Sequence, residues 1–189
     1  MNEADTLMSP QPSPTPSAKT SRSGLKLVYL SLGSNLGNRL DRIRGALAEL
    51  DSRGIKVRHV SSFYKTQPVD FLPQPWFLNC AAEAETALMP MQLLRAVKAV
   101  ERAIGRRPGV EKGPRVIDID ILLYENVVVR SPTLTIPHAR LQERRFVLVP
   151  LEELAPELRH PVDKRTVSEL LHASTDRSQV IRFKGSAAV

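Results

Sequence analysis

Apolar residues in the first part of the chain recur with two different periods, and each period predicts a different element. Residues 25–35 are rich in apolar and β-branched side chains and predict a strand that ends at Gly33. After this strand, apolar residues return at steps of four and three, which is the stripe of an amphipathic helix. Gly54 marks the end of that helix. The stripe consists of Leu36, Leu40, Ile43, Leu47 and Leu50.

Strand and helix patterns then repeat. Residues 55–66 and 77–86 are rich in strand-forming or apolar side chains and predict a second and a third strand. The three prolines within residues 67–76 predict a loop between them. Pro90 suits the first turn of a helix that Gly105 ends. The expected buried face of this helix consists of Leu94, Val97, Val100 with Glu101, and Ile104.

Residues 115–126 predict a fourth strand, in which aspartates alternate with isoleucines. One face would carry Val116, Asp118, Asp120 and Leu122, and the other Ile117, Ile119, Ile121 and Leu123. The remaining elements are short, with strands at 127–130 and 179–183, a loop at 131–145, and helices at 146–156 and 167–172. This interleaving, with hairpin-like joins, predicts an α+β fold whose mainly antiparallel sheet is covered by helices on one side.

The N-terminal segment differs in composition from the rest of the chain. Residues 1–24 are rich in Pro, Ser and Thr and bury too little apolar surface to fold, so we expect a disordered tail before one domain at residues 25–189. The tail lacks the apolar core of a secretory signal, and no apolar run has the length of a membrane span. The single cysteine, Cys80, fits a reducing compartment, so we expect a cytoplasmic protein.

The charge distribution indicates an anionic partner. The formal net charge is +7, which favours either nucleic acid or a phosphorylated small molecule. Arg95 and Lys98 are explained as a solvated helix face. The basic residues that precede the two aspartates, Arg106, Lys112 and Arg115, predict an anion site.

Asp118 and Asp120 stand two positions apart on the predicted fourth strand, so their Cβ atoms lie about 6.5–7 Å apart on one face. Two such carboxylates can converge on metal ions, and Mg²⁺ takes one or two carboxylates together with substrate phosphates. The alternative is that both are surface acids on an edge strand. Acids for metal beside bases for phosphate favour phosphoryl transfer.

Two further patches have a functional and a structural interpretation. Phe77 and Asn79 share a strand face, and an aromatic ring beside an amide suits a flat heterocycle; core packing and turn capping are the alternatives. His138 lies in a loop near Arg144 and Phe146, where it either donates to phosphate or is solvated.

Five motifs together resemble one known family. "SLGSNLGNR", "SSFYKTQP", "PWFLNCA", "GPRVIDIDILLY" and "TIPHARLQERRFVLVPL" occur in the order and near the spacing found in 6-hydroxymethyl-7,8-dihydropterin pyrophosphokinases, from about Leu27 to Pro161. The resemblance implies a ferredoxin-like α/β sandwich. It also implies transfer of the diphosphate of ATP to the pterin hydroxymethyl group, with release of AMP and with two Mg²⁺ ions.

The resemblance also implies roles for individual residues. Asp118 and Asp120 match the metal-binding aspartates, and these two with Arg106 and Arg115 form the expected catalytic set. The expected ATP-binding residues are Glu101, Arg106, Lys112, Arg115, Ile121, Thr135, His138 and Arg144. The expected pterin-binding residues are Thr66, Val69, Phe77, Asn79 and Phe146. The chain departs from the family pattern at Lys98, Lys112, Thr133 and Ala139.

Two other functions are the alternatives to a pyrophosphokinase. The first is an RNA-binding module of ferredoxin-like topology, which would need an aromatic "RGFGFVxF"-like pattern that this chain lacks. The second is a non-catalytic pterin-binding relic. We expect a monomeric enzyme that binds ATP and hydroxymethyldihydropterin, but neither nucleic acid nor membrane. AMP release that requires the pterin would exclude both rivals.

Overall fold

The computed structural model describes residues 24–69, 73–107 and 113–184. Almost all of the expected disordered tail and Lys112 therefore lie outside the described residues. The elements in chain order are β1 (Lys26–Ser34), α1 (Arg39–Ser52), β2 (Ile55–Val60), β3 (Tyr64–Thr66), β4 (Phe77–Thr86), α2 (Pro90–Ala103), β5 (Asp118–Tyr124), β6 (Val129–Arg130), β7 (Thr135–Ile136), the 3₁₀ turn η1 (Leu141–Glu143), α3 (Arg145–Leu154), α4 (Val167–Ala173) and β8 (Val180–Arg182).

An antiparallel sheet forms the middle layer, with strands in the order β5-β1-β4-β3-β8 and with β2 also paired to β4. If β2 and β3 are counted as one interrupted strand, the order from β1 to β5 is β-α-β-β-α-β, which is that of the ferredoxin-like fold. The predicted α+β class is confirmed. β6 and β7 form a separate small hairpin.

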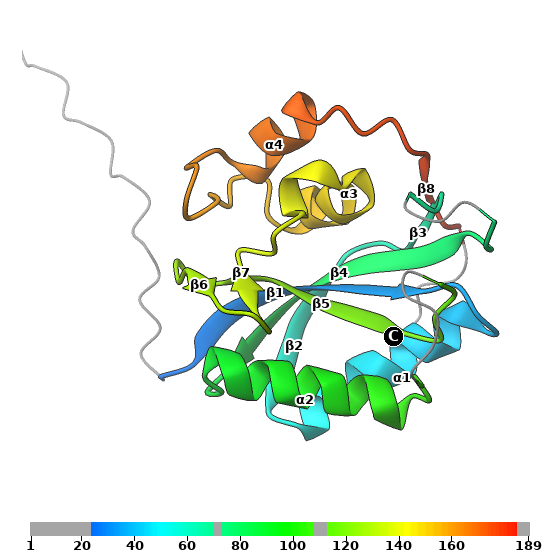
Figure 1. The fold of residues 1–189 in the computed structure, drawn as a ribbon, viewed down its shortest axis with the longest axis horizontal. Coiled ribbons are helices and arrows are strands. Elements are labelled where there is room, and N and C mark those ends of the chain that lie inside the picture. Colours follow the sequence, from blue (N-terminus) through cyan, green and yellow to red (C-terminus); the bar gives the residue numbers. More distant parts are fainter. Residues whose placement is uncertain (1–23, 70–72, 108–112, 185–189) are drawn as a thin grey trace, which may run out of the picture.

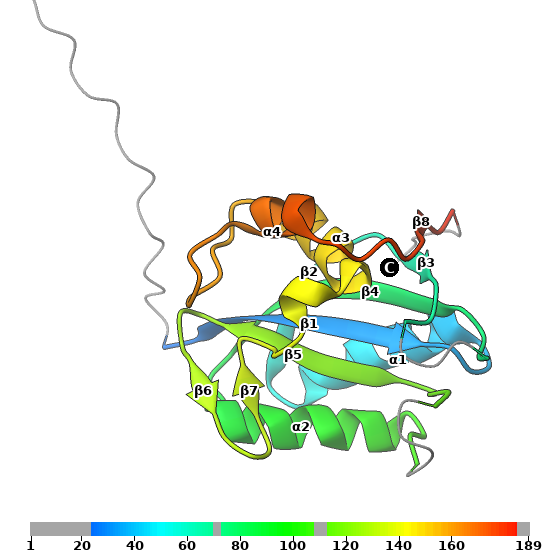
Figure 2. The ribbon, with the colours of Figure 1, turned by 45° about the horizontal axis from the view of Figure 1, so that its top comes forward.

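Helices cover both faces of the sheet, so the prediction of helices on one side is wrong (Figures 1 and 2). α1 and α2 pack on one face over Leu30 and Leu32, whereas α3 and α4 pack on the other, over Tyr29 and Ala81. Alternation along β1 places apolar side chains on both faces, and each face therefore has to be covered to remove them from water.

The strand predicted at residues 55–66 is divided into β2 and β3. Val60 pairs with Ala82 and Tyr64 pairs with Asn79, so between these pairs the chain from β2 to β3 has one residue more than β4. At the break, the Ser61 hydroxyl accepts the Ala81 N–H at 2.9 Å and takes the place of a backbone acceptor. Such an extra residue bends the strand that carries it.

A bulge also interrupts the alternation predicted for the fourth strand. Leu30 pairs with Ile121 and Tyr29 pairs with Leu123, which leaves Leu122 between the two pairs. Leu122 and Leu123 consequently both pack toward α3, although opposite faces were predicted for them. The aspartates precede the bulge and keep the predicted face.

The segment expected to be a loop at residues 131–145 contains β7 and η1. The predicted helix boundary glycines are confirmed: Gly54 and Gly105 adopt φ of 76° and 104°, where a side chain would be strained. On α2, Leu93 is fully buried while Leu94 and Ile104 are only partly buried, so the buried face is rotated slightly from the predicted one. None of the described helices is long and apolar enough to cross a membrane.

Candidate active site

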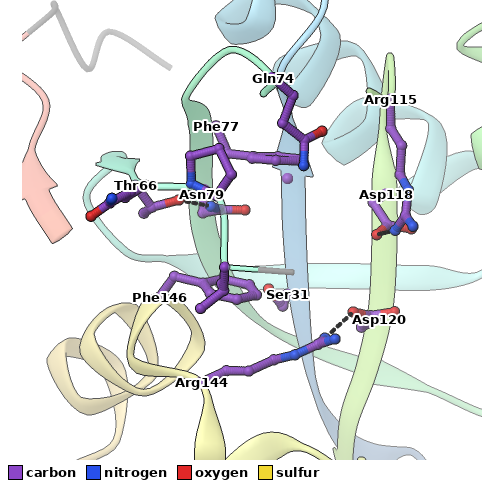
Figure 3. A pocket seen from close by; sticks show the side chains of 14 residues that line it. Ser31, Thr66, Gln74, Phe77, Asn79, Arg115, Asp118, Asp120, Arg144 and Phe146 are labelled. Atoms are coloured by element: carbon purple, nitrogen blue, oxygen red, sulfur yellow. Dashed lines mark hydrogen bonds and ion pairs between the residues drawn. The ribbon is translucent and has the colours of Figure 1, made fainter. Parts of the chain in front are cut away.

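A pocket opens on the face of the sheet that carries α3, beside the start of that helix (Figure 3). Its walls come from β1, β4 and β5, from the end of β3, and from the residues around the start of α3. The lining residues are Ser31, Gly33, Thr66, Gln67, Pro68, Val69, Gln74, Phe77, Asn79, Arg115, Asp118, Asp120, Arg144 and Phe146. The sequence predictions included nine of these fourteen.

The interior strand β1 separates two chemically different halves of the pocket. Gly33 of β1 pairs with Asp118 of β5 on one side and with Asn79 of β4 on the other. Figure 3 shows the two aspartates on one side of the pocket and Asn79 with Thr66 on the other. The acidic and the amide side chains therefore face the same space across one strand.

In the charged half, two arginines contact the same carboxylate. Arg106 Nη1 lies 2.5 Å from Asp118 Oδ1, and Arg115 Nη1 contacts Asp118 Oδ2. Asp120 is less closely paired, since Arg144 Nη1 and His138 Nε2 lie 3.7 Å and 3.8 Å from its Oδ2. These distances exceed those of direct hydrogen bonds.

Glu101 lies behind Arg106. Its side chain is 2% exposed, and Oε1 accepts the Ile119 N–H at 2.8 Å while also contacting Arg106. Burial lowers the pKa of Arg106, but the charges of Asp118 and Glu101 outweigh burial and raise it. Glu101 thus orients Arg106 from within the fold, and its predicted role in ATP binding stays a prediction.

His138 presents one ring nitrogen to the charged half. Its Nδ1 accepts the Arg140 N–H at 3.2 Å, so the tautomer that fits carries the proton on Nε2, which faces Asp120. Burial and the neighbouring Arg144 lower the pKa of His138, and the opposing effect of Asp120 does not offset them. The ring is therefore neutral near pH 7 and can donate from Nε2.

In the other half, a buried amide and two aromatic rings face the pocket. Asn79 Nδ2 donates to Thr66 Oγ1 at 2.6 Å, and both residues are buried. Phe77 of β4 and Phe146 of α3 lie on opposite sides of the pocket (Figure 3). This wall can stack a flat ring and hydrogen-bond its edge.

Position 33, between Asn79 and Asp118 on the pocket floor, has room only for glycine. A Cβ atom at this position would lie 2.2 Å from Asn79 Oδ1, far inside contact distance. A side chain there would displace the amide. Neither Gly33 nor Ser31 was predicted as a site residue, although strand alternation places both on the face of the pocket.

Asn35 was also missed by the sequence predictions. Its Oδ1 accepts the Arg115 N–H at 2.6 Å, and its Nδ2 donates to Gln74 Oε1 at 3.0 Å and to the Pro75 carbonyl at 3.2 Å. Asn35 therefore ties the loop that precedes β4 to the segment that carries Arg115. "GSN" at the end of a strand was the only local signal for this role.

Five of the predicted ATP-binding residues that the structure describes do not line the pocket, although two of them, Arg106 and His138, lie beside its aspartates. Ile121 packs in the core on the opposite face of the sheet, and Glu101 lies behind Arg106. Thr135 is exposed on β7 and borders a separate depression that also includes His138. Lys112 lies outside the described residues.

The donor set of the charged half fits a magnesium ion. Within residues 24–69, 73–107 and 113–184, no group of three or more His, Cys, Asp or Glu side chains is arranged to hold a metal. Asp118 and Asp120 both line the pocket with partly exposed carboxylates. Two carboxylates that leave the other positions to water and substrate oxygens are a common Mg²⁺ arrangement.

Paired carboxylates beside arginines, next to an aromatic and amide wall, are typical of an enzyme that transfers a phosphoryl group to a flat heterocycle. Comparison with known families agrees with this class. The model of the 7,8-dihydro-6-hydroxymethylpterin-pyrophosphokinase (HPPK) family matches residues 29–156, and the chain belongs to this family.

Relatives of two lengths are similar to the chain. A 2-amino-4-hydroxy-6-hydroxymethyldihydropteridine pyrophosphokinase of Methylorubrum extorquens is 43% identical over 158 residues, covering 83% of this chain and 98% of that protein. The Folic acid synthesis protein fol1 of Schizosaccharomyces pombe is 47% identical over 147 residues, covering 77% of this chain. The chain spans only 20–27% of that protein and of three other eukaryotic relatives.

Solved structures support the fold. A crystal structure of Plasmodium falciparum HPPK-DHPS superposes with a TM-score of 0.64 at 17% identity, covering 78% of this chain and 45% of that one. The wild-type protein of that species with pterin and p-hydroxybenzoate gives a TM-score of 0.63, covering 81% of this chain and 42% of that one.

Proposed function

We propose that this chain transfers the diphosphate group of ATP to the hydroxymethyl oxygen of 6-hydroxymethyl-7,8-dihydropterin, which gives the pterin diphosphate and AMP in folate biosynthesis. The observation that carries the proposal is that a wall of aromatic and amide side chains and a wall of aspartates and arginines share one pocket with only β1 between them. Membership of the HPPK family supports the same reaction.

The pterin ring would lie between Phe77 and Phe146, with its polar edge at Asn79 and Thr66. This orientation directs the hydroxymethyl group toward β5. The hydroxymethyl oxygen attacks the β-phosphorus of ATP and forms an O–P bond, and its proton is released to solvent. The bond between the β-phosphorus and the oxygen that bridges it to the α-phosphorus breaks, and that oxygen leaves with AMP. Positioning of the two substrates in line supplies much of the rate.

The arginines would exchange partners when ATP binds. Arg106 and Arg115 contact Asp118 in the structure, and their guanidinium groups also suit phosphate oxygens. Asp118 and Asp120 would then hold Mg²⁺, which supplies charge neutralisation at the transferred phosphates, and we propose two ions as in the family. Arg144 and the Nε2–H of His138 provide further contacts to phosphate.

The cellular context is also proposed. The buried free thiol of Cys80 fits a reducing compartment such as the cytoplasm, and we propose a monomer there. The names of two plant relatives describe those proteins as mitochondrial, so compartment can differ within the family.

The test is AMP formation from ATP, with and without hydroxymethyldihydropterin and Mg²⁺. Asp118→Asn and Asp120→Asn should each lower the turnover rate at least about 100-fold while thermal melts remain cooperative. Asp163→Asn is the matched control, because Asp163 is also paired with an arginine, Arg165, and does not line the pocket. Wild-type turnover in both site variants would refute the metal assignment. Equal AMP release with and without the pterin would refute the proposed reaction.

A further inference from the structure

The segment that follows α4, residues 174–182, contacts both the start of α3 and the strand β3, and we propose that its Asp176 is a positioning residue for pterin binding. The proposal rests on the proposed function. This segment lies beyond residues 29–156, which the family model matches, and it runs past α3 to reach β8 beside β3 (Figure 2). Its contacts at both ends involve the pocket.

At the first end, Asp176 caps the helix that carries Phe146. The residue preceding α3, Arg144, provides no side-chain cap, and Asp176 Oδ2 instead accepts the Arg145 N–H at 2.8 Å. The residues on either side of that N–H, Arg144 and Phe146, both line the pocket. A fixed Arg145 N–H therefore fixes the backbone from which both pocket side chains extend.

Asp176 is itself held in place and charged. Its Oδ1 accepts the Ser178 N–H at 2.8 Å, and its own N–H donates to Ser174 Oγ at 3.3 Å. Burial raises the pKa of the Asp176 carboxyl, but hydrogen bonds from the backbone N–H groups of Ser178 and Arg145 outweigh burial and lower it. The ionised carboxylate also interacts favourably with the positive end of the helix dipole.

At the second end, the segment pairs with the strand that carries Thr66. Val180 pairs with Thr66, and the Gln179 carbonyl accepts the Gln67 N–H at 3.0 Å. Gln67 lines the pocket, and Thr66 accepts the hydrogen bond from Asn79. The same short segment thus contacts the start of α3, which carries Phe146, and also β3, which carries Thr66.

The experiment compares Asp176→Ala with Thr166→Ala. Thr166 caps the neighbouring helix α4 by accepting the Glu169 N–H at 3.1 Å, so its loss removes the same kind of bond without touching the pocket. Both variants should lower the melting temperature. Only Asp176→Ala should raise KM for hydroxymethyldihydropterin, by about five- to tenfold, the size expected for one lost cap. Titration with 6-hydroxymethylpterin, without ATP, should show the same loss of affinity.

A conservative variant gives a second measurement. Asp176→Asn keeps one acceptor oxygen and should bind 6-hydroxymethylpterin with an affinity between those of the wild type and Asp176→Ala. Equal KM values for Asp176→Ala and Thr166→Ala would overturn the positioning role. If Asp176→Ala does not fold, wild-type pterin affinity in Asp176→Asn would overturn it. A wild-type chain that binds no 6-hydroxymethylpterin would instead refute the proposed function and with it the basis of this inference.

Discussion

Replacement of Gly33 by alanine should remove pterin recognition while leaving the fold intact. The new Cβ would lie 2.2 Å from Asn79 Oδ1, 3.4 Å from Asn79 Cγ and 3.8 Å from Phe77 Cδ1. The two carbon contacts are tolerable, whereas the oxygen contact is not. The Asn79 amide therefore has to move by about 1 Å, and displacements of this size at a site cost on the order of 100-fold in rate.

The same movement affects stability. The Asn79 amide donates to Thr66 Oγ1 at 2.6 Å inside the protein, and a buried polar group that loses its partner costs about 1–3 kcal/mol. Gly33→Ala should therefore reduce kcat/KM for the pterin about 100-fold and lower the free energy of unfolding by about 1–3 kcal/mol. The KM for ATP should change little, because Asp120 and Arg144 lie on the other side of the pocket.

The assay measures AMP at saturating ATP with varied pterin, together with direct titration of the pterin and urea unfolding. Gly45→Ala is the matched control, because a Cβ there would meet only Ile104 Cδ1, at an ordinary 3.4 Å, among the described residues. In the middle of α1 this alanine should stabilise the chain by up to about 1 kcal/mol. Wild-type pterin affinity in Gly33→Ala would refute the assignment of Gly33 and Asn79 to the substrate wall.

Two further predictions concern residues outside the substrate wall. Asn35→Ala should lower kcat at least about tenfold, because it releases Arg115 and the loop that contains Gln74. Asn35→Asp keeps the acceptor for the Arg115 N–H and should lower kcat less. Equal kcat values for the two variants in steady-state assays would contradict this link. Burial and the nearby Arg165 lower the pKa of His160, and the opposing charge of Asp163 does not restore it. The unfolded chain therefore takes up a proton first as pH falls below about 6.5, so stability is fully present above that pH and declines on acidification. Urea unfolding at pH 7.5 and 5.5 should show a smaller decline in His160→Gln than in the wild type, and an identical decline would exclude His160 as a source.

The predictions from the sequence were correct where periodicity or a terminal residue within one element determines its structure. The four-and-three stripe and the glycines at the helix ends act within one element. The structure agrees with both glycines and with the stripe from Leu40 to Leu50, whereas Leu36 precedes α1 and is exposed. The failures come from contacts between elements. The extra residue between β2 and β3 and the bulge at Leu122 depend on pairing partners that local periodicity does not reveal.

The same contrast between local patterns and contacts between elements applies to the candidate site. Asp118 and Asp120 were predicted to share a face because alternation along one strand is a local property, and the structure places both in the pocket. Gly33 and Asn35 were missed because their roles arise from neighbours on other strands and loops. The roles of the site residues in catalysis remain predictions that the variants described above will test.

Asp118, Gly33 and Asn79 lie in one row across three neighbouring strands, so the sheet sets the distance between the two outer residues. Adjacent strands lie about 4.8 Å apart, so the backbones of Asp118 and Asn79 are about 10 Å apart. Backbone hydrogen bonds fix that interval, and no side-chain rotation can change it. The distance between the polar edge of a bound ring at Asn79 and its reacting substituent at Asp118 therefore has to match the spacing of the backbone. Side-chain substitutions in the pocket leave that spacing unchanged.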